Sequence, residues 1–322
     1  MVNLRTGFSV RLAMIAACVL MALMLCSCAT QNEVAVRDAV NDYSWGELSA
    51  LSDEIAAAPD EESALQIAVA YHLVNDEGKL DGSQVKEIEL ADGSVARAAI
   101  ADFRHDDLHG GNKAGITFVF EDAVALRPMN NNAGFDDLDE TDAVSATGGW
   151  TGSDARDWLN ADFVDELPAD LQLALKDVVK RSCVVPEKQA GGQTGQGALN
   201  VPVESLMGES VDKLWLLALA ELAEVSDETY YAEVNPEWTD VMRAEGTPYK
   251  LFADAGVDEF GSYDVLKMAC LDGSQKSMPC AWWLRSVEDW TFVHVTKGGS
   301  IERDFEAVNG GDSLGIVACF AI

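Results

Sequence analysis

The chain begins with a positively charged segment and a continuous apolar run. Arg5 and Arg11 lead into residues 12–25, which contain only Met, Ala, Leu, Ile, Val and Cys. This run is shorter than the roughly 20 apolar residues that a membrane-spanning helix needs. A charged start, a short apolar run and small residues after it are typical of a secretory signal peptide. We therefore predict a signal peptide over residues 1–27.

The pattern then becomes amphipathic. Apolar residues three and four apart predict helices over 47–57 and 61–74, with Asp60 as the N-cap of the second. An Asp92-Gly93 pair lies between two strand-like runs, so we expect a β-hairpin of residues 85–90 and 95–103. A third strand is predicted over 116–120.

In the second half of the chain, apolar residues follow the helical spacing in some segments and the strand pattern in others. Ser153 is expected to cap a helix through Phe163, and Pro168 to begin an amphipathic helix that extends through Val179. Residues 213–217 fit either a buried strand or the start of a helix. Further strands are predicted over 281–285, 290–296, 301–305 and 315–322.

This order of elements predicts an α+β fold: a helical N-terminal part plus a hairpin, followed by a mixed or antiparallel sheet with two helices. Strands and helices do not alternate, so a doubly wound parallel sheet is not expected. We predict a tether over 28–45 and one body over 46–322. Within the body, residues 46–125 hold the first helices and the hairpin, and residues 126–322 form the strand-rich part.

The end of the signal peptide predicts where the protein is held. Leu25-Cys26-Ser27-Cys28 resembles the bacterial lipobox, although Cys26 is unusual at its position. The resemblance implies a thioether-linked lipid on Cys28 and cleavage before it, so we expect an exported protein anchored to the outer face of a bacterial membrane. The alternative is an ordinary cleaved signal peptide with incidental cysteines.

The amino-acid composition limits the classes of molecule that the protein is expected to bind. The net charge is −33, while 48% of the residues are hydrophobic. Nucleic-acid binding needs a basic surface, which this chain lacks. Contact of the body with an anionic bilayer is disfavoured for the same reason, whereas cations are attracted. The apolar content is enough to build a core.

Four cysteines remain beyond the lipobox: Cys183, Cys270, Cys280 and Cys319. An exported compartment permits disulfides, but four cysteines allow three pairings. Cys270 and Cys280 flank a short polar loop and are the easiest pair to join. Buried free thiols are the alternative, and Cys319 in an apolar run fits it best.

Several distinctive motifs follow one another along the chain. They are Phe103-Arg104-His105-Asp106-Asp107 with Lys113 to Phe118, Gly148-Gly149-Trp150 with Ser153 to Asn160, Leu167-Pro168, Trp282-Trp283-Leu284-Arg285-Ser286, and the terminal strand. Together these motifs resemble one family, DUF6273, a domain of unknown function in exported bacterial proteins. The resemblance extends from about Trp45 to Ile322, and it implies a C-type-lectin-like fold, of the formylglycine-generating-enzyme type, for the last part.

Two groups of residues could bind metal. His105 and His109 have the spacing of zinc ligands on one helical face, but Gly110 and Gly111 follow at once and favour a turn. Calcium takes oxygen ligands, and an acidic run could supply them, so calcium is the candidate cofactor; a solvated loop is the alternative. The run contains Asp136, Asp137, Asp139 and Asp142.

Tryptophans provide the candidate ligand site. An exposed Trp beside acidic and basic side chains would suit a sugar, by stacking and hydrogen bonding. The candidates are Trp283, Arg285, Trp290, Asp154 and Arg156. Neighbouring residues of a strand point to opposite faces, so at most one of Trp282 and Trp283 is expected to be buried on a given face. The alternative is that these residues form the core and its ion pair.

No nucleophile elbow, phosphate loop or Cys-x-x-Cys motif is present. The leading hypothesis is therefore a membrane-anchored, surface-displayed binding module for a glycan or a protein. One alternative is a cell-envelope hydrolase that uses His105 and His109 or a pair of carboxylates as a glycosidase. The other is a structural envelope protein.

Overall fold

The structure is a computed structural model that describes residues 34–130, 146, 148–184, 202–226, 236–261, 264–270, 278–288, 291–302 and 313–322. The chain divides into Met1–Ala35 and Val36–Ile322. The predicted signal peptide and Cys28 lie outside the described residues. In the described ranges, no helix combines the length and apolarity needed to cross a bilayer.

Two N-terminal helices open the body, α2 (Trp45–Ala56) and α3 (Glu61–Ala70). Ser44 and Glu47 form a capping box at the start of α2, and the Asp60 side chain caps α3 as predicted. A short 3-10 helix, η1 (Val40–Asp42), precedes them. Val40 and Tyr43 are buried, so the described part of the predicted tether, from Val36 on, packs into the body.

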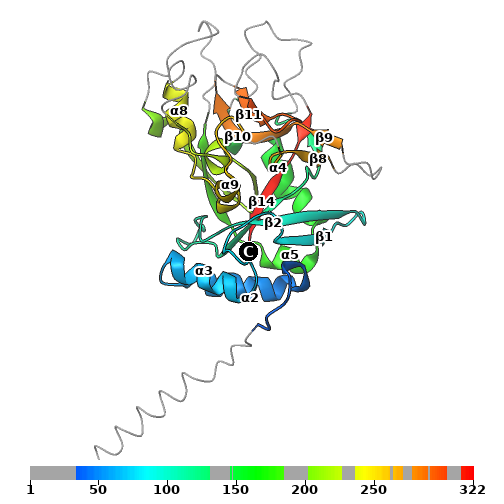
Figure 1. Cartoon of the computed structure of the whole chain (residues 1–322). Helices are drawn as coiled ribbons and strands as arrows, with labels where there is room; N and C mark the ends of the chain where they lie inside the picture. The colour runs from blue at the N-terminus through cyan, green and yellow to red at the C-terminus, as the bar shows by residue number, and fades with distance from the viewer. Residues whose placement is uncertain are drawn as a thin grey trace, which may run out of the picture. The chain divides into compact units, whose positions relative to one another are not determined.

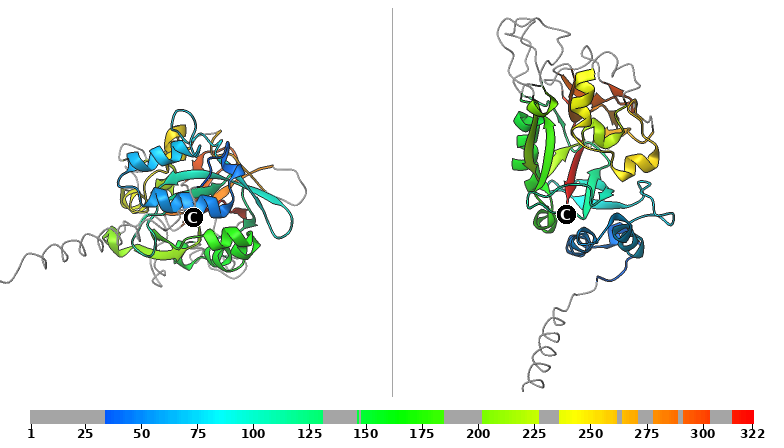
Figure 2. Two further views of the ribbon diagram at one scale, coloured as in Figure 1. Left: turned by 90° about the horizontal axis from the view of Figure 1, so that it is seen from below. Right: turned by 90° about the vertical axis from the view of Figure 1, so that its left-hand side faces the viewer.

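The first sheet has the order β1-β2-β3-β14-β7, and every neighbouring pair is antiparallel. The predicted hairpin and third strand are confirmed. The helices α2 and α3 lie side by side next to this sheet, and β14 runs through the middle of the body (Figures 1 and 2). The strands are β1 (Val85–Glu89), β2 (Val95–Phe103), β3 (Ile116–Phe120), β7 (Leu214–Leu216) and β14 (Ala318–Ala321).

The second sheet has the order β12-β11-β10-β13-β4, and β10 pairs with β13 in parallel. Two hairpins accompany it, one of β5 with β6 and one of β8 with β9. The strands are β4 (Leu126–Arg127), β5 (Val178–Cys183), β6 (Met207–Asp212), β8 (Met268–Cys270), β9 (Met278–Cys280), β10 (Trp282–Glu288), β11 (Thr291–Val295), β12 (Ile301–Glu302) and β13 (Leu314–Gly315).

Short helices connect these strands. They are α4 (Asp154–Ala161), α5 (Ala169–Ala174), α6 (Leu219–Leu222), α8 (Pro236–Arg243) and α9 (Lys250–Ala255), with 3-10 turns η2 (Trp150–Gly152), η3 (Phe163–Glu166) and η4 (Val203–Ser205). The described body is thus a mixed α+β structure, with N-terminal helices followed by antiparallel and mixed sheets. This confirms the predicted class.

The predicted helix from Pro168 through Val179 is wrong in its second half. The helix α5 ends at Ala174, and the chain turns at Leu175 into the strand β5. Val178 and Val179 instead pair with Asp212 and Val211 of β6. Their β-branched side chains fit a strand well, and the ladder with β6 outweighs the helical spacing. Residues 214–216 resolve the open choice in favour of a strand.

The expectation that burial would separate Trp282 from Trp283 is also wrong. Both indoles are 0% exposed, and every residue of β10 is buried. A strand that is covered on both faces hides both sets of alternating side chains. Because β10 contacts α8, β5 and β7 as well as its sheet neighbours, neither face is open to solvent.

Gly115 allows α2 to lie close to β3. A Cβ atom at this position would lie 1.8 Å from the carbonyl oxygen of Ser52. We predict that Gly115→Ala lowers the free energy of unfolding by about 1–3 kcal/mol, measured by urea denaturation. Gly46, which lies within α2 and has open space around it, is the matched control. Gly46→Ala should stabilise the protein by up to about 1 kcal/mol, and equal effects of the two changes would contradict the close approach.

Candidate functional site

Motif residues from distant parts of the chain meet in a group of buried charges. We call this group the buried charge cluster; its members are Asp106, Lys180, Glu221, Glu245 and Arg285, and all are fully or almost fully buried. They come from the loop after β2, from β5, from α6, from the turn after α8 and from β10. Buried charges are stable only when they are paired and hydrogen-bonded. Asp106, Lys180, Glu221 and Arg285 are joined by ion pairs, and Glu245 is hydrogen-bonded.

The first half of the cluster is built on Asp106. Its carboxylate accepts hydrogen bonds from the Lys180 ammonium, from the Thr117 hydroxyl at 2.5 Å and from the Tyr249 hydroxyl at 2.9 Å. Burial alone would raise the pKa of Asp106, but the charges and hydrogen bonds of Lys180 and His105 together outweigh it and lower the pKa. Lys180 also donates to Glu221 at 2.8 Å, and its ammonium lies 4.4 Å from the centre of the Trp215 ring.

The second half is a bidentate pair between Arg285 and Glu221. The guanidinium donates to both carboxylate oxygens of Glu221, one of them at 2.9 Å. Its other contacts are the Leu216 carbonyl at 2.8 Å and the Ser182 hydroxyl at 3.1 Å. Desolvation would raise the pKa of Glu221, and the charges of Arg285 and Lys180 lower it instead. This fork geometry is typical of strong arginine–carboxylate pairs.

Glu245 is the buried acid without an adequate cation. Its carboxylate accepts the Cys183 N–H at 3.1 Å and hydrogen-bonds with the Ser286 hydroxyl, while Arg285 reaches only its backbone carbonyl at 3.0 Å. Burial raises the pKa of Glu245 to about 7. The cluster therefore carries a titratable group near neutral pH.

A second motif also cross-links the interior. Asp212 accepts the Trp150 indole N–H at 3.0 Å and the Arg156 Nε–H at 2.6 Å. Asn160 accepts the Lys213 N–H at 2.8 Å and donates to the Leu214 carbonyl at 2.9 Å. The spacing Trp150–Arg156–Asn160 thus places three side chains along one stretch of β6 and β7. These residues hold α4 against the strands.

The predicted ligand residues do not gather at a surface. Trp283 and Arg285 are 0% exposed, and the Trp283 indole donates to the Arg127 carbonyl at 3.0 Å. Arg156 is bound to Asp212, whereas Asp154 is partly exposed in the first turn of α4. Trp290 lies outside the described residues. A ligand cannot reach Trp283 or Arg285 in this conformation, which argues against a site built on them.

The histidine spacing does not occur on a helix. Arg104 has a left-handed backbone with φ of 52°, and the residues after it form a turn. His105 Nε2 lies 3.0 Å from the Thr247 carbonyl oxygen, and His109 is exposed. Within the described ranges, no group of three potential ligands is close enough to hold a metal ion.

Other candidates remain predictions. Asp136, Asp137, Asp139 and Asp142 lie outside the described residues, and so does the side chain of Cys270. The predicted Cys270–Cys280 loop is bounded by the hairpin of β8 and β9, in which Cys270 is opposite Met278 and Cys280 is opposite Met268. Cys319 is a buried free thiol, in agreement with the alternative.

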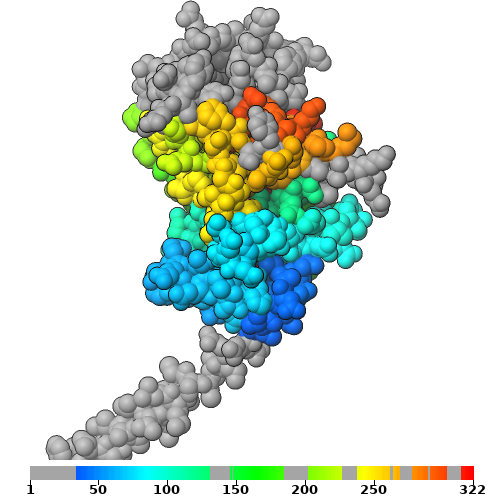
Figure 3. Space-filling view, viewed as in Figure 1, coloured from blue at the N-terminus to red at the C-terminus, as the bar shows by residue number. Residues whose placement is uncertain are grey.

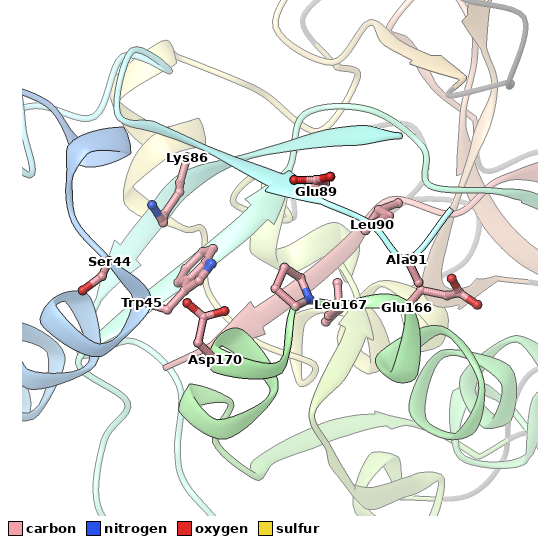
Figure 4. A pocket seen from close by; sticks show the side chains of 10 residues that line it. Ser44, Trp45, Lys86, Glu89, Leu90, Ala91, Glu166, Leu167 and Asp170 are labelled. Carbon is pink, nitrogen blue, oxygen red and sulfur yellow. The ribbon is translucent and has the colours of Figure 1, made fainter. Parts of the chain in front are cut away.

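An open pocket of about 440 Å³ lies on the surface of the body. Three segments line it: the start of α2, the end of β1 with the turn after it, and the connection from η3 to α5 (Figure 4). Its size falls within the range of small-molecule and peptide sites. The lining residues are Ser44, Trp45, Lys86, Glu89, Leu90, Ala91, Glu166, Leu167, Pro168 and Asp170.

Local contacts fix the pocket in place. The Ala91 N–H donates to the Glu166 carbonyl at 2.9 Å, which joins the turn after β1 to the connection before α5. The Trp45 ring packs edge-on against Phe118 and Phe320, with centroids 5.6 and 5.9 Å away. Figure 3 shows the N-terminal part of the body, which supplies two of the three walls, drawn from blue to cyan. A preformed wall reduces the entropy lost on binding.

The pocket has an apolar floor and an acidic rim. Leu90, Leu167 and Trp45 are buried, whereas the carboxylates of Glu89, Glu166 and Asp170 are exposed. The Lys86 ammonium is the one cation among the lining residues; it donates to the Tyr43 carbonyl at 2.5 Å and lies 5.1 Å from the Trp45 ring centre. Desolvation lowers the pKa of Lys86, an effect that Asp170 partly offsets.

Comparison with known proteins identifies the domain. The buried cross-links define a body that is held together internally by charged motif residues. The sequence model of DUF6273, a domain of unknown function, matches residues 115–317, so the chain belongs to this family. No curated protein and no solved structure matches the chain. The match is narrower than the predicted resemblance from Trp45, and the pocket residues before 115 lie outside it.

Sequence reasoning missed two acids of the buried charge cluster, Glu221 and Glu245. Glu221 lies in the run Ala218-Leu219-Ala220-Glu221-Leu222, where one charge among apolar residues is a signal of a buried, paired group. Glu245 and Tyr249 lie in a polar stretch that carries no such signal. The pocket was missed because its three walls lie far apart along the chain, with 41 positions from Trp45 to Lys86 and 75 from Ala91 to Glu166, and no periodicity predicts that they meet.

Proposed function

We propose that the protein is a surface-displayed binding module, held by a lipid on Cys28 at the outer face of a bacterial membrane, and that its ligand occupies the pocket between α2, β1 and α5. The observation that carries this proposal is the pocket itself, with its apolar floor and charged rim. The proposed ligand is still a glycan or a protein, as predicted from the sequence, but we now place its site in this pocket and not at the buried tryptophans.

Part of the pocket lining lies inside the matched family range and part lies before it, which supports a role particular to this chain rather than one common to the family. Ser44, Trp45 and the residues of β1 precede the matched family range, whereas Glu166 to Asp170 lie within it. The pocket is therefore shaped jointly by the family domain and by this chain's own N-terminal part.

Filling the pocket should abolish binding. Ala91 lines the pocket and is exposed, so Ala91→Trp would occupy the space without disturbing the core. We expect ligands found on glycan and peptide arrays with the purified protein to bind at least about tenfold more weakly to this variant. Ala50→Trp, on an exposed position of α2 outside the pocket, is the matched control. Array ligands that bind both variants equally would show that the site lies elsewhere.

We further propose a C-type-lectin-like arrangement for the last part of the chain. It is supported by the return of the terminal strand β14 to the centre of the first sheet, beside β3, together with the motif resemblance. Calcium binding by Asp136, Asp137, Asp139 and Asp142 belongs to this proposal. Thermal unfolding with calcium or with magnesium tests it: a rise in Tm with calcium alone is expected, and no change would contradict it.

The hydrolase alternatives have less support. The metal version needed His105 and His109 on one helical face, and the chain forms a turn there. The acids of the buried charge cluster are sealed from solvent, so a glycosidase pair among them could not reach a sugar. A structural envelope role would be favoured if pocket-filling and array experiments gave no ligand.

A further inference from the structure

We propose that the pocket binds a short extended peptide that carries a basic side chain, lysine or arginine. This inference rests on the proposed function, because it assigns a ligand chemistry to the same pocket. It uses four features of the lining: an indole N–H, an open strand edge, three carboxylates and an apolar floor.

The indole of Trp45 offers an unused hydrogen-bond donor. The residue is only 4% exposed, and among the described residues its Nε1–H has no hydrogen-bond partner, while the nitrogen keeps some contact with solvent. Figure 4 shows the indole nitrogen of Trp45 on the side of the ring that is turned toward Leu167. A ligand acceptor such as a peptide carbonyl could take the place of solvent at this donor and form a hydrogen bond in a largely buried setting.

The edge of β1 offers backbone groups to the same space. The Leu90 N–H donates to the Ser94 carbonyl at 2.8 Å, and Glu89 is opposite Val95. In an antiparallel ladder the bonded residues alternate, so the N–H and C=O of Glu89 point away from β2. Glu87, two residues earlier, uses the same edge to donate to the Asn41 side chain at 2.9 Å. An extended peptide could therefore pair with Glu89 by strand addition.

The charges select a cation. Glu89, Glu166 and Asp170 surround the pocket, and none of them forms an ion pair with another residue that the structure describes. Lys86 opposes them, but its ammonium is turned to the carbonyl oxygens of Asn41 and Tyr43. Three carboxylates against one ammonium leave an acidic rim, which agrees with the net charge of −33. A basic side chain would lay its methylene groups on Leu90, Leu167 and Pro168 and its charge at the rim.

The test uses three capped tripeptides with the purified protein: acetyl-Ala-Lys-Ala-amide and its norleucine and glutamate versions. Norleucine keeps the length of the lysine side chain but not the charge. By calorimetry we expect the lysine peptide to bind at least about tenfold more tightly than the other two, because charge-assisted hydrogen bonds are stronger than neutral ones. Its affinity should fall several-fold between low and high salt, since salt screens exposed charges.

Variants locate the recognition. Glu166→Gln combined with Asp170→Asn should weaken the lysine peptide about tenfold and leave the norleucine peptide unchanged, and Glu87→Gln, which is on β1 but not in the lining, should change neither. Trp45→Phe removes the N–H and keeps an aromatic ring; it should weaken all peptides about equally, with the Tm checked for folding.

The outcomes separate the two proposals. If the lysine and norleucine peptides bind equally and Ala91→Trp blocks both, the pocket is the site and the preference for a cation is overturned. If no peptide binds but Ala91→Trp blocks a glycan from the array, the peptide inference is overturned and the binding module stands. If Ala91→Trp blocks nothing that binds, both are overturned.

Discussion

Replacing Glu221 with alanine should lower the free energy of unfolding by about 3–5 kcal/mol. The carboxylate of Glu221 is shared by Arg285 and Lys180, and all three side chains are buried. Removing the acid leaves two cations with only Asp106 as a firmly ionised partner. Breaking a buried pair in this way is more costly than losing its attraction, because an uncompensated charge stays in the interior. The measurement is urea denaturation at neutral pH.

Two further variants separate charge from volume. Glu221→Gln keeps the shape of the side chain and removes its charge. If electrostatics dominates, this variant should show most of the decrease in the free energy of unfolding that we expect for Glu221→Ala. Glu54→Ala is the control for removing an acid, because Glu54 is exposed on α2; we expect a change within about 0.5 kcal/mol. A loss below about 1 kcal/mol for Glu221→Gln would show that the cluster does not depend on this charge.

The second large effect concerns pH. Burial raises the pKa of Glu245 from 4.5 to about 7. Between these values the unfolded chain releases the proton and the folded protein keeps it, so the stabilising effect of protonation is fully present below pH 4.5 and is lost as the pH rises to 7. The total is on the order of 3 kcal/mol, from 1.36 kcal/mol for each pKa unit.

Glu245→Gln should remove the loss of stability that accompanies the rise in pH. Its amide can accept the Cys183 N–H and donate to Ser286, in place of the protonated acid. We expect the variant to gain stability over the natural protein by on the order of 3 kcal/mol between pH 4.5 and pH 7, with no further gain above pH 8. Urea denaturation across this range measures the difference.

The contributions of the other titrating groups cancel when the natural protein and Glu245→Gln are compared at the same pH. Because the pKa values of Asp106 and Glu221 are lowered, these two groups stabilise the folded protein above pH 4, and this stabilisation is lost as the pH falls. The raised pKa of His105 acts in the opposite sense, as its stabilisation is lost when the pH rises through the folded value. Both proteins contain these groups. A difference that does not depend on pH would contradict the buried, protonated state of Glu245.

The family motifs have a structural rather than a ligand-binding explanation. Asp106, Arg285 and Ser286 reach the buried charge cluster, while Trp150 and Arg156 meet at Asp212. We interpret the motif spacing as the requirement of an interior held by ion pairs. This explains why the residues that we considered for sugar binding are sealed inside. Among the motifs, only Leu167-Pro168 lines the surface pocket.

Local elements were predictable because nearby residues specify them. The capped helices, the Asp92-Gly93 hairpin and the strand of residues 116–120 each depend on caps, turns or periodicity within a short window. The same reasoning failed at Val178 and Val179, where the ladder with β6 decides the structure. It failed again at Trp283, because alternation along a strand does not tell whether both faces are covered.

The sequence by itself determined the α+β class, the N-terminal helices and the hairpin, and it predicts the signal peptide and lipid anchor. Only the tertiary structure decided that Glu221 meets Arg285 across 64 residues, and that Trp45, Glu89 and Asp170 line one pocket. Contacts of this kind depend on how whole elements pack, and packing free energy is shared among many residues that are distant in the chain. No local pattern records it, so the candidate ligand site became visible only in the folded body.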